Sequence, residues 1–165
     1  MLLCLFRHGI AIDHTDLACP EESERFLTEK GRRRTRLAVE GLRALGVSPE
    51  LVISSPWTRA LQTAELVMEA LEPSETQLLF DEDLLPMSPP RKILHRLADH
   101  DVNEVMLVGH APHLDLLLDE LCGGARREYL TKAGAAYMEL DPHDPTHGVL
   151  RWALPSKELR ALAAR

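Results

Sequence analysis

The stretch LLCLFRHG, residues 2–9, joins an apolar run to a basic pair and a glycine, and it is the best guide to the fold. A short apolar run that ends on polar residues is typical of a buried strand. Similar β-prone runs occur at residues 51–54, 77–80 and 105–108, and patterns typical of helices separate them. Because strands alternate with helices, the sequence predicts a three-layer α/β sandwich with a mostly parallel central sheet flanked by helices.

Local signals indicate where the intervening helices begin. Thr28 is the expected N-cap of the first helix, and Gly46 its stop. Ser55-Pro56 is expected to open the second helix, Ser88-Pro89-Pro90 the third and Pro112 the fourth, since serine caps and proline fits the first turn. Further along the chain, AAYMEL and VLRWAL predict a hairpin or two edge strands before a final helix from about residue 155.

Length and composition predict one soluble globular domain over residues 1–165, because 45% of the residues are hydrophobic and no linker interrupts the pattern. Acidic residues outnumber basic ones 26 to 19, for a net charge of −7, which argues against nucleic acid and membrane surfaces as partners. No window approaches the ~20 apolar residues of a membrane span. The three cysteines form no CxxC pair, so neither a disulfide framework nor a zinc knuckle is indicated, and a reducing cytosol fits.

Arginine and histidine side chains follow three of the predicted strands. Arg7 and His8 end the first strand, Arg59 lies just after the second, and His110 follows the fourth. Each alone is an ordinary loop or helix residue, but the carboxyl ends of parallel strands meet at one edge of a sheet. We therefore expect two arginines and two histidines to converge.

Such a group suits a phosphoryl ligand. Arginine binds phosphate oxygens in pairs, and a neutral histidine can attack phosphorus while cations stabilise the transferring group. On this interpretation Arg7 holds the phosphoryl group and His8 attacks it, and Gly9 lets the backbone come close. Gly9 and Ala111, which follow the two histidines, complete the predicted phosphate-binding set.

Four segments resemble the histidine phosphatase superfamily, which has the phosphoglycerate-mutase-like fold. They are RHG (7–9), LTEKGRRR (27–34), SSPWTRALQTA (54–64) and LVGHAP (107–112), in the family's order. The resemblance implies that His8 accepts the phosphoryl group, that Arg7, Arg59 and His110 form the phosphate pocket, and that neither a metal nor a dissociable cofactor is needed. The family usually has a carboxylic acid after its third strand; here Asp83 of DLLP takes that position, with Glu82 as the rival.

The segment between Asp83 and His110 is fully used by one predicted helix and one strand, so no capping insertion is expected. An open pocket grips a small substrate poorly but admits a phosphoryl group carried on a protein. In its length, its lack of a cap and its DLLP turn, the chain resembles the small SixA-type phosphohistidine phosphatases. This resemblance implies a phosphohistidine-carrying phosphoprotein as substrate. A phosphatase acting on a small phosphate ester, such as a sugar phosphate or nucleotide, is the alternative, and a non-catalytic phosphate-binding module is a third hypothesis.

Other motifs are open to two interpretations. His110-x2-His113 and the pair His143 and His147 each resemble half a metal site, but surface histidines are expected because neither has a full ligand set. The basic segment 32–36 could steer an acidic phosphoprotein, or form a solvated helix face. Trp57 could border the pocket mouth, or simply pack against the core.

Overall fold

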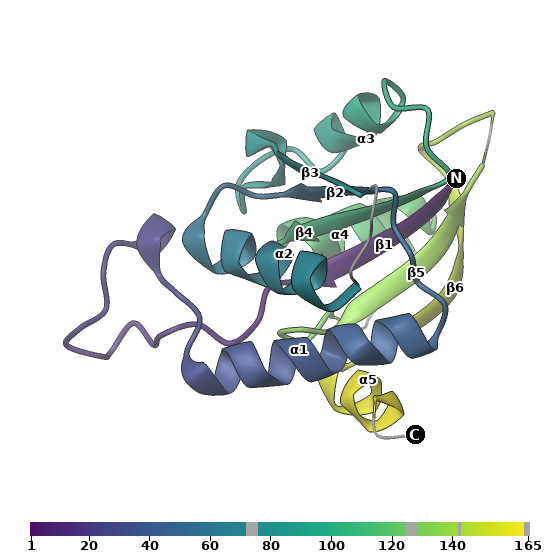
Figure 1. The fold of residues 1–165 in the computed structure, drawn as a ribbon. Helices are drawn as coiled ribbons and strands as arrows, with labels where there is room; N and C mark the ends of the chain where they lie inside the picture. Colours follow the sequence, from purple (N-terminus) through teal and green to yellow (C-terminus); the bar gives the residue numbers. More distant parts are fainter. Residues whose placement is uncertain (72–75, 125–128, 142, 164–165) are drawn as a thin grey trace.

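A central six-stranded sheet has the strand order β3-β2-β4-β1-β5-β6 (Figure 1). The structure, a computed structural model, describes residues 1–71, 76–124, 129–141 and 143–163. Four strands run parallel and form the predicted part of the sheet: β1 (Leu2–Arg7), β2 (Leu51–Ser54), β3 (Gln77–Phe80) and β4 (Glu104–Gly109). The predicted hairpin is also present, as antiparallel β5 (Ala135–Leu140) and β6 (Gly148–Leu154) at one edge.

Helices cover both faces of this sheet. One layer contains α1 (Glu29–Ala44), α2 (Thr58–Leu71) and α5 (Ser156–Leu162), and the opposite layer contains α3 (Lys92–Leu97) and α4 (His113–Leu121). Two short 3-10 turns, η1 (Glu22–Glu24) and η2 (Glu82–Leu84), lie in the connections. The predicted three-layer α/β sandwich is thus observed.

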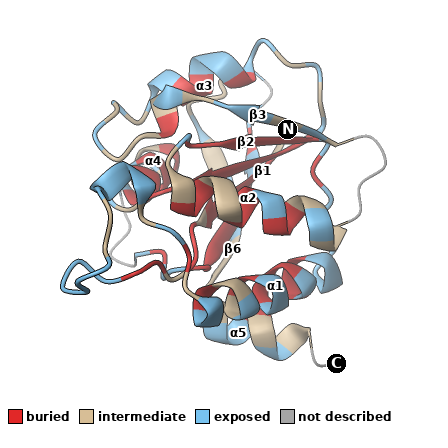
Figure 2. Cartoon of the chain, turned by 60° about the vertical axis from the view of Figure 1, so that its left-hand side comes forward, coloured by how far each residue is buried: buried red, intermediate tan, exposed pale blue. Residues whose placement is uncertain are grey.

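The apolar run of β1 is continuous because both of its faces are buried. Leu3 and Leu5 pack into the core under α3 and α4, whereas Cys4 and Phe6 pack into the core under α1 and α2. All four side chains are inaccessible to solvent. Figure 2 shows the same burial in the neighbouring strands of the central sheet. The first strand therefore anchors both cores and fixes where its last residues lie.

The helix starts confirm some of the sequence signals and correct others. Thr28 caps α1 as predicted, with its hydroxyl accepting from the Gly31 N–H at 3.0 Å. By contrast, α2 begins at Thr58, later than Ser55-Pro56 predicted. Ser88 is also not a helix cap, since α3 begins at Lys92 and the Ser88 hydroxyl donates to the Glu82 carbonyl.

Gly31 lets α1 lie directly against the loop that follows β1. A Cβ at this position would stand 2.0 Å from the Ile10 carbonyl oxygen, so any side chain here would push the helix away. The sequence thus places α1 close to the end of the first strand. Among the described residues, no helix has the length and apolar character needed to cross a membrane.

Candidate phosphoryl-transfer site

The predicted residues converge at the carboxyl edge of the parallel strands. His8 directly follows β1, and its backbone N–H donates to the carbonyl of Gly109, the last residue of β4, at 3.0 Å. His110 comes next along the chain, and its ring centroid lies 5.1 Å from that of His8. Arg59, in the first turn of α2, also contacts His8. Parallel pairing of β1 with β4 and of β2 with β4 brings these groups together.

His8 is held in one tautomer by its neighbours. Arg59 Nε–H donates to His8 Nε2 at 3.2 Å, and because a guanidinium only donates, this ring nitrogen is the acceptor. The proton therefore belongs on Nδ1, which donates to the Gly9 carbonyl at 2.7 Å. Burial lowers the pKa of His8 to about 3, and the charges of Arg59 and Arg7 act in the same direction. At neutral pH, His8 is a neutral imidazole with a lone pair on Nε2.

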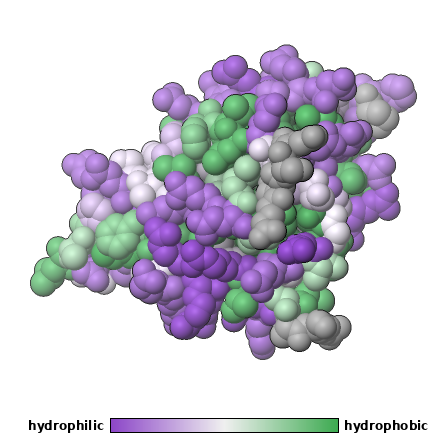
Figure 3. Space-filling model, in the orientation of Figure 1, coloured by the Kyte–Doolittle hydropathy of each residue, from purple (hydrophilic) through white to green (hydrophobic). Residues whose placement is uncertain are grey.

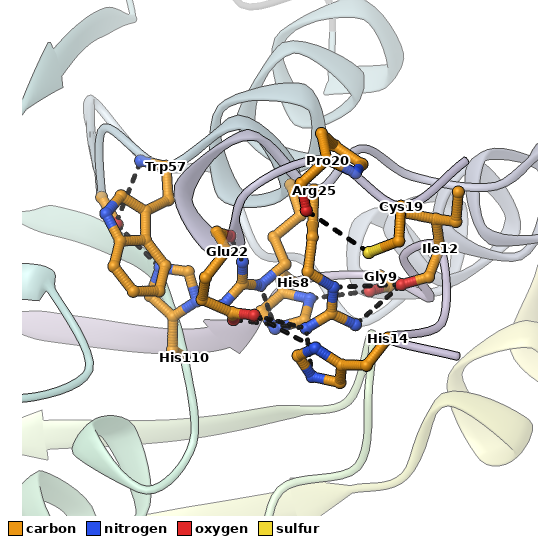
Figure 4. Close-up of polar contacts among 12 residues, drawn as sticks. His8, Gly9, Ile12, His14, Cys19, Pro20, Glu22, Arg25, Trp57 and His110 are labelled. Atoms are coloured by element: carbon orange, nitrogen blue, oxygen red, sulfur yellow. Dashed lines mark hydrogen bonds and ion pairs between the residues drawn. The ribbon is translucent and has the colours of Figure 1, made fainter. Parts of the chain in front are cut away.

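His110 is enclosed by Ser55 and Trp57. Its Nε2 lies 2.8 Å from the Ser55 hydroxyl, and the Trp57 ring meets its ring edge-on with centroids 5.2 Å apart (Figure 4). Burial lowers the pKa of His110 to about 2, with further contributions from His8 and Arg59. Trp57 thus borders the site, and the Ser55 hydroxyl that was expected to cap α2 contacts a site histidine.

Arg59 is bound by an acidic residue that sequence reasoning missed. Its two terminal nitrogens donate to the backbone carbonyl of Glu22 at 2.7 Å and to Glu22 Oε1 at 2.8 Å. The other carboxylate oxygen of Glu22 lies 3.1 Å from Arg25 and 3.4 Å from His14 (Figure 4). The Arg59 guanidinium also lies over the Trp57 ring, at 4.9 Å from the centroid. Nothing in the acidic run around Glu22 signals this pairing, because it spans 37 positions of sequence.

Arg7 is oriented by the loop that precedes β5. One terminal nitrogen donates to the Leu130 carbonyl at 2.6 Å, and the Leu130 N–H in turn donates to Asp115 Oδ1 at 2.7 Å. Asp115 also opposes the effect of burial on the Arg7 pKa. The Nε of Arg7 is buried without a partner among the described residues. Arg7 thus has donor capacity for an anion at the site.

Gly9 and Ala111 differ in what surrounds them. The Gly9 N–H donates to the Thr63 hydroxyl at 3.1 Å, and a Cβ on Gly9 would stand 2.3 Å from the Thr35 hydroxyl. Close packing against α1 and α2 therefore already explains the glycine. Ala111 is half-buried between His110 and Pro112. The phosphate-binding roles of both residues stay predictions.

Asp83 lies in η2, beside cations of α3. Its two oxygens lie 3.8 Å from Lys92 and 3.8 Å from Arg96, and its N–H donates to the Asp81 side chain. The rival carboxylate, Glu82, is exposed. The proton-donor role of Asp83 therefore stays a prediction.

His113 corrects the expectation of a surface residue, since its side chain is completely buried. Neither ring nitrogen has a hydrogen-bond partner in the described part of the chain, and burial lowers its pKa. His143 and His147 are exposed, as expected. Within the described ranges, no three His, Cys, Asp or Glu side chains gather as a metal site.

Known proteins resemble this chain over most of its length. The model of the histidine phosphatase superfamily (branch 1) matches residues 3–87. An uncharacterized protein of Picosynechococcus sp. (strain ATCC 27264 / PCC 7002 / PR-6) is 35% identical over 139 residues, 81% of this chain and 82% of the relative. Phosphohistidine phosphatase SixA of Escherichia coli (strain K12) is 30% identical over 168 residues, 99% of each chain. The solved structure of the protein histidine phosphatase SixA complexed with tungstate has a TM-score of 0.83 and 29% identity, covering 96% of this chain and 99% of that one. The predicted phosphoglycerate-mutase-like fold is confirmed.

Proposed function

Since the chain belongs to the histidine phosphatase superfamily, we propose that it is a phosphatase that transfers the phosphoryl group through His8 and acts on phosphohistidine carried by a protein. The observation that carries the proposal is the tautomer of His8. With its proton held on Nδ1 by the Gly9 carbonyl, the Nε2 lone pair lies beside the Arg59 guanidinium. A neutral imidazole next to a cation is what attack on an anionic phosphoryl group requires.

The reaction proceeds in two displacements at phosphorus. In the first, the Nε2 lone pair of His8 forms a bond to phosphorus as the bond to the substrate nitrogen breaks, and the leaving imidazole takes up a proton from solvent or from Asp83, the predicted donor. In the second, water attacks phosphorus and gives up a proton to the predicted donor carboxylate or to solvent, the bond to Nε2 breaks and inorganic phosphate leaves. Arg7, Arg59 and His110 surround His8 and stabilise the charge on the phosphoryl oxygens.

The preference for phosphohistidine has two supports. The full-length relative at 30% identity carries the name phosphohistidine phosphatase. In addition, the segment between Asp83 and His110 is taken up by the short α3 and by β4, which supports an uncapped site. An imidazole leaves with little help from an acid, because its conjugate acid has a pKa near ~6.5. Such a substrate tolerates an open site and a loosely placed proton donor.

Rapid quench with labelled phosphohistidine peptide tests the role of His8. The expected result is an acid-labile, alkali-stable phosphoenzyme in the native chain and none in His8→Ala. Turnover is expected to survive EDTA, because the arginines supply positive charge at the site. Near-normal turnover by the His8→Ala variant would reject His8 as the nucleophile. A higher kcat/KM for alkyl phosphates than for phosphohistidine in direct competition would instead favour the small-molecule phosphatase.

A further inference from the structure

A basic pocket with a volume of about 400 Å³ lies beside the backbone that carries His8, since Ala133 in its wall is hydrogen-bonded to the carbonyls of Arg7 and His8. It lies between the beginnings of α1 and α5 and the loop before β5, and its walls include Ile10, Arg34, Lys132, Ala133, Lys157 and Arg160. Strongly hydrophilic side chains gather over α1 in the lower part of the face shown in Figure 3. The volume is in the range of ligand-binding clefts rather than of packing defects.

Four cationic side chains line this basic pocket: Arg34, Lys132, Lys157 and Arg160. None of the four forms an ion pair with a carboxylate of the described residues. Some arginines elsewhere on the surface do have acidic partners; Arg36, for example, pairs with Glu69 at 3.2 Å. On a chain with a net charge of −7, this is a local concentration of positive charge without carboxylate partners in the described ranges, and it favours an anionic ligand.

The basic pocket shares its wall with the backbone of the nucleophile. The Ala133 N–H donates to the carbonyls of both Arg7, at 3.1 Å, and His8, at 3.0 Å. Ile10 follows His8 by two positions and contributes to the same wall. Lys132 lines the pocket, and its charge acts on the His8 ring. The basic pocket and the phosphoryl site are therefore joined through the backbone of residues 7–10 and through Lys132.

We propose that the basic pocket binds acidic side chains that flank the phosphohistidine of the protein substrate. This inference rests on the proposed function and names the part of the substrate that the phosphoryl site does not contact. An extended chain advances ~3.3–3.6 Å per residue, so residues a few positions from the phosphohistidine reach the basic pocket. Carboxylates there would pair with Arg34 and Lys157, which lie on two different helices.

Two synthetic peptides of equal length test the proposal, each with one phosphohistidine, flanked by aspartates in one and by asparagines in the other. The native chain is expected to hydrolyse the aspartate peptide with a kcat/KM about tenfold higher, the equivalent of one or two partly exposed ion pairs. The difference should shrink at high salt, since exposed charges are screened.

The double variant Arg34→Glu/Lys157→Glu is expected to lose this preference, and to prefer a third peptide flanked by lysines. Lys132 is left intact because its charge acts on His8. The matched control is Lys30→Glu/Arg33→Glu, which changes the net charge equally at two exposed α1 residues outside the pocket and should keep the preference.

Three results would overturn the proposal: equal rates on the two peptides in the native chain, a preference that survives in Arg34→Glu/Lys157→Glu, or a preference that the control variant loses as well. Hydrolysis of phosphoimidazole is measured beside the peptides. Failure of the native chain to hydrolyse phosphoimidazole and both peptides would reject the proposed function itself, whereas normal phosphoimidazole turnover without peptide preference would reject only the acidic docking site.

Discussion

The Nε–H of Arg59 donates to Nε2 of His8 at 3.2 Å, so the proposed nucleophilic atom is hydrogen-bonded to a guanidinium in the absence of substrate. The same guanidinium uses its two terminal nitrogens on Glu22. Arg59 is therefore bound on three nitrogens, and substrate must either replace some of these contacts or share them. This relationship leads to the first two predictions.

Replacing Arg59 is expected to be costly for transition-state binding. Arg59→Ala should reduce kcat/KM on phosphoimidazole by the equivalent of ~2–5 kcal/mol, as when one partner of a buried charged pair is lost. Arg59→Lys should recover only part of this, because an ammonium cannot supply the planar set of donors. Arg36→Ala, at an exposed arginine of α1, is the control. A loss below tenfold for Arg59→Ala, in a variant with a native thermal midpoint, would place Arg59 outside the transition-state contacts.

Glu22 is expected to compete with phosphate for Arg59. Glu22→Gln removes a negative charge 2.8 Å from the guanidinium and should strengthen inhibition by inorganic phosphate and vanadate about two- to tenfold. The effect is limited because the Glu22 side chain is 45% exposed and its charge is screened. Glu24→Gln, an exposed carboxylate in the same turn, should leave the inhibition constants unchanged. Weaker inhibition in Glu22→Gln would show that the carboxylate positions Arg59 rather than competing for it.

The main features of the site could be predicted from sequence because they depend on where strands end. Arg7, His8 and His110 directly follow buried apolar runs, and parallel pairing alone brings such ends together. The contact of Glu22 with Arg59 depends instead on the path of a long connection, which no local pattern encodes. The Ser55 hydroxyl accepts the Trp57 N–H at 3.4 Å, as a capping signal predicts, but it also contacts His110, and no local pattern encodes that tertiary contact.

The burial of His113 follows from the helix pattern around it. His113 begins α4, and of the buried positions that follow it, Leu114, Leu117, Leu118 and Leu121 are apolar, Asp115 being the exception. That spacing places residue 113 on the buried stripe of the helix.

Replacing His113 should make the fold more stable and less sensitive to acid. Burial lowers the pKa of His113, so below ~6.5, its ordinary value when unfolded, the unfolded chain takes up a proton that the folded chain does not. Stability is therefore complete above that pH and falls below it, by at most ~1.4 kcal/mol per pH unit for this histidine. His113→Leu removes this dependence and also a buried imidazole without partners among the described residues, whose burial costs ~1–3 kcal/mol.

Urea unfolding at pH 7 and pH 5 measures the effect. His113→Leu is expected to raise the unfolding free energy by ~1 kcal/mol at pH 7 and by more at pH 5. His143→Leu, at an exposed histidine, should leave the difference between the two pH values unchanged. Equal acid sensitivity of His113→Leu and the native chain would contradict the assigned neutral state of His113.

The last prediction concerns Asp83, whose oxygens lie 3.8 Å from Lys92 and from Arg96. An alkoxide leaving from a phosphate ester is strongly basic, so a positioned acid is worth ~10²- to 10⁴-fold, whereas an imidazole leaving from phosphohistidine needs little help. Asp83→Asn is therefore expected to reduce alkyl phosphate hydrolysis severely but phosphohistidine hydrolysis by less than about tenfold. Glu82→Gln, at the exposed neighbour, is the matched control and should change neither rate. Equal large losses on both substrates would reject the leaving-group argument, and a loss confined to Glu82→Gln would transfer the proton-donor role to Glu82.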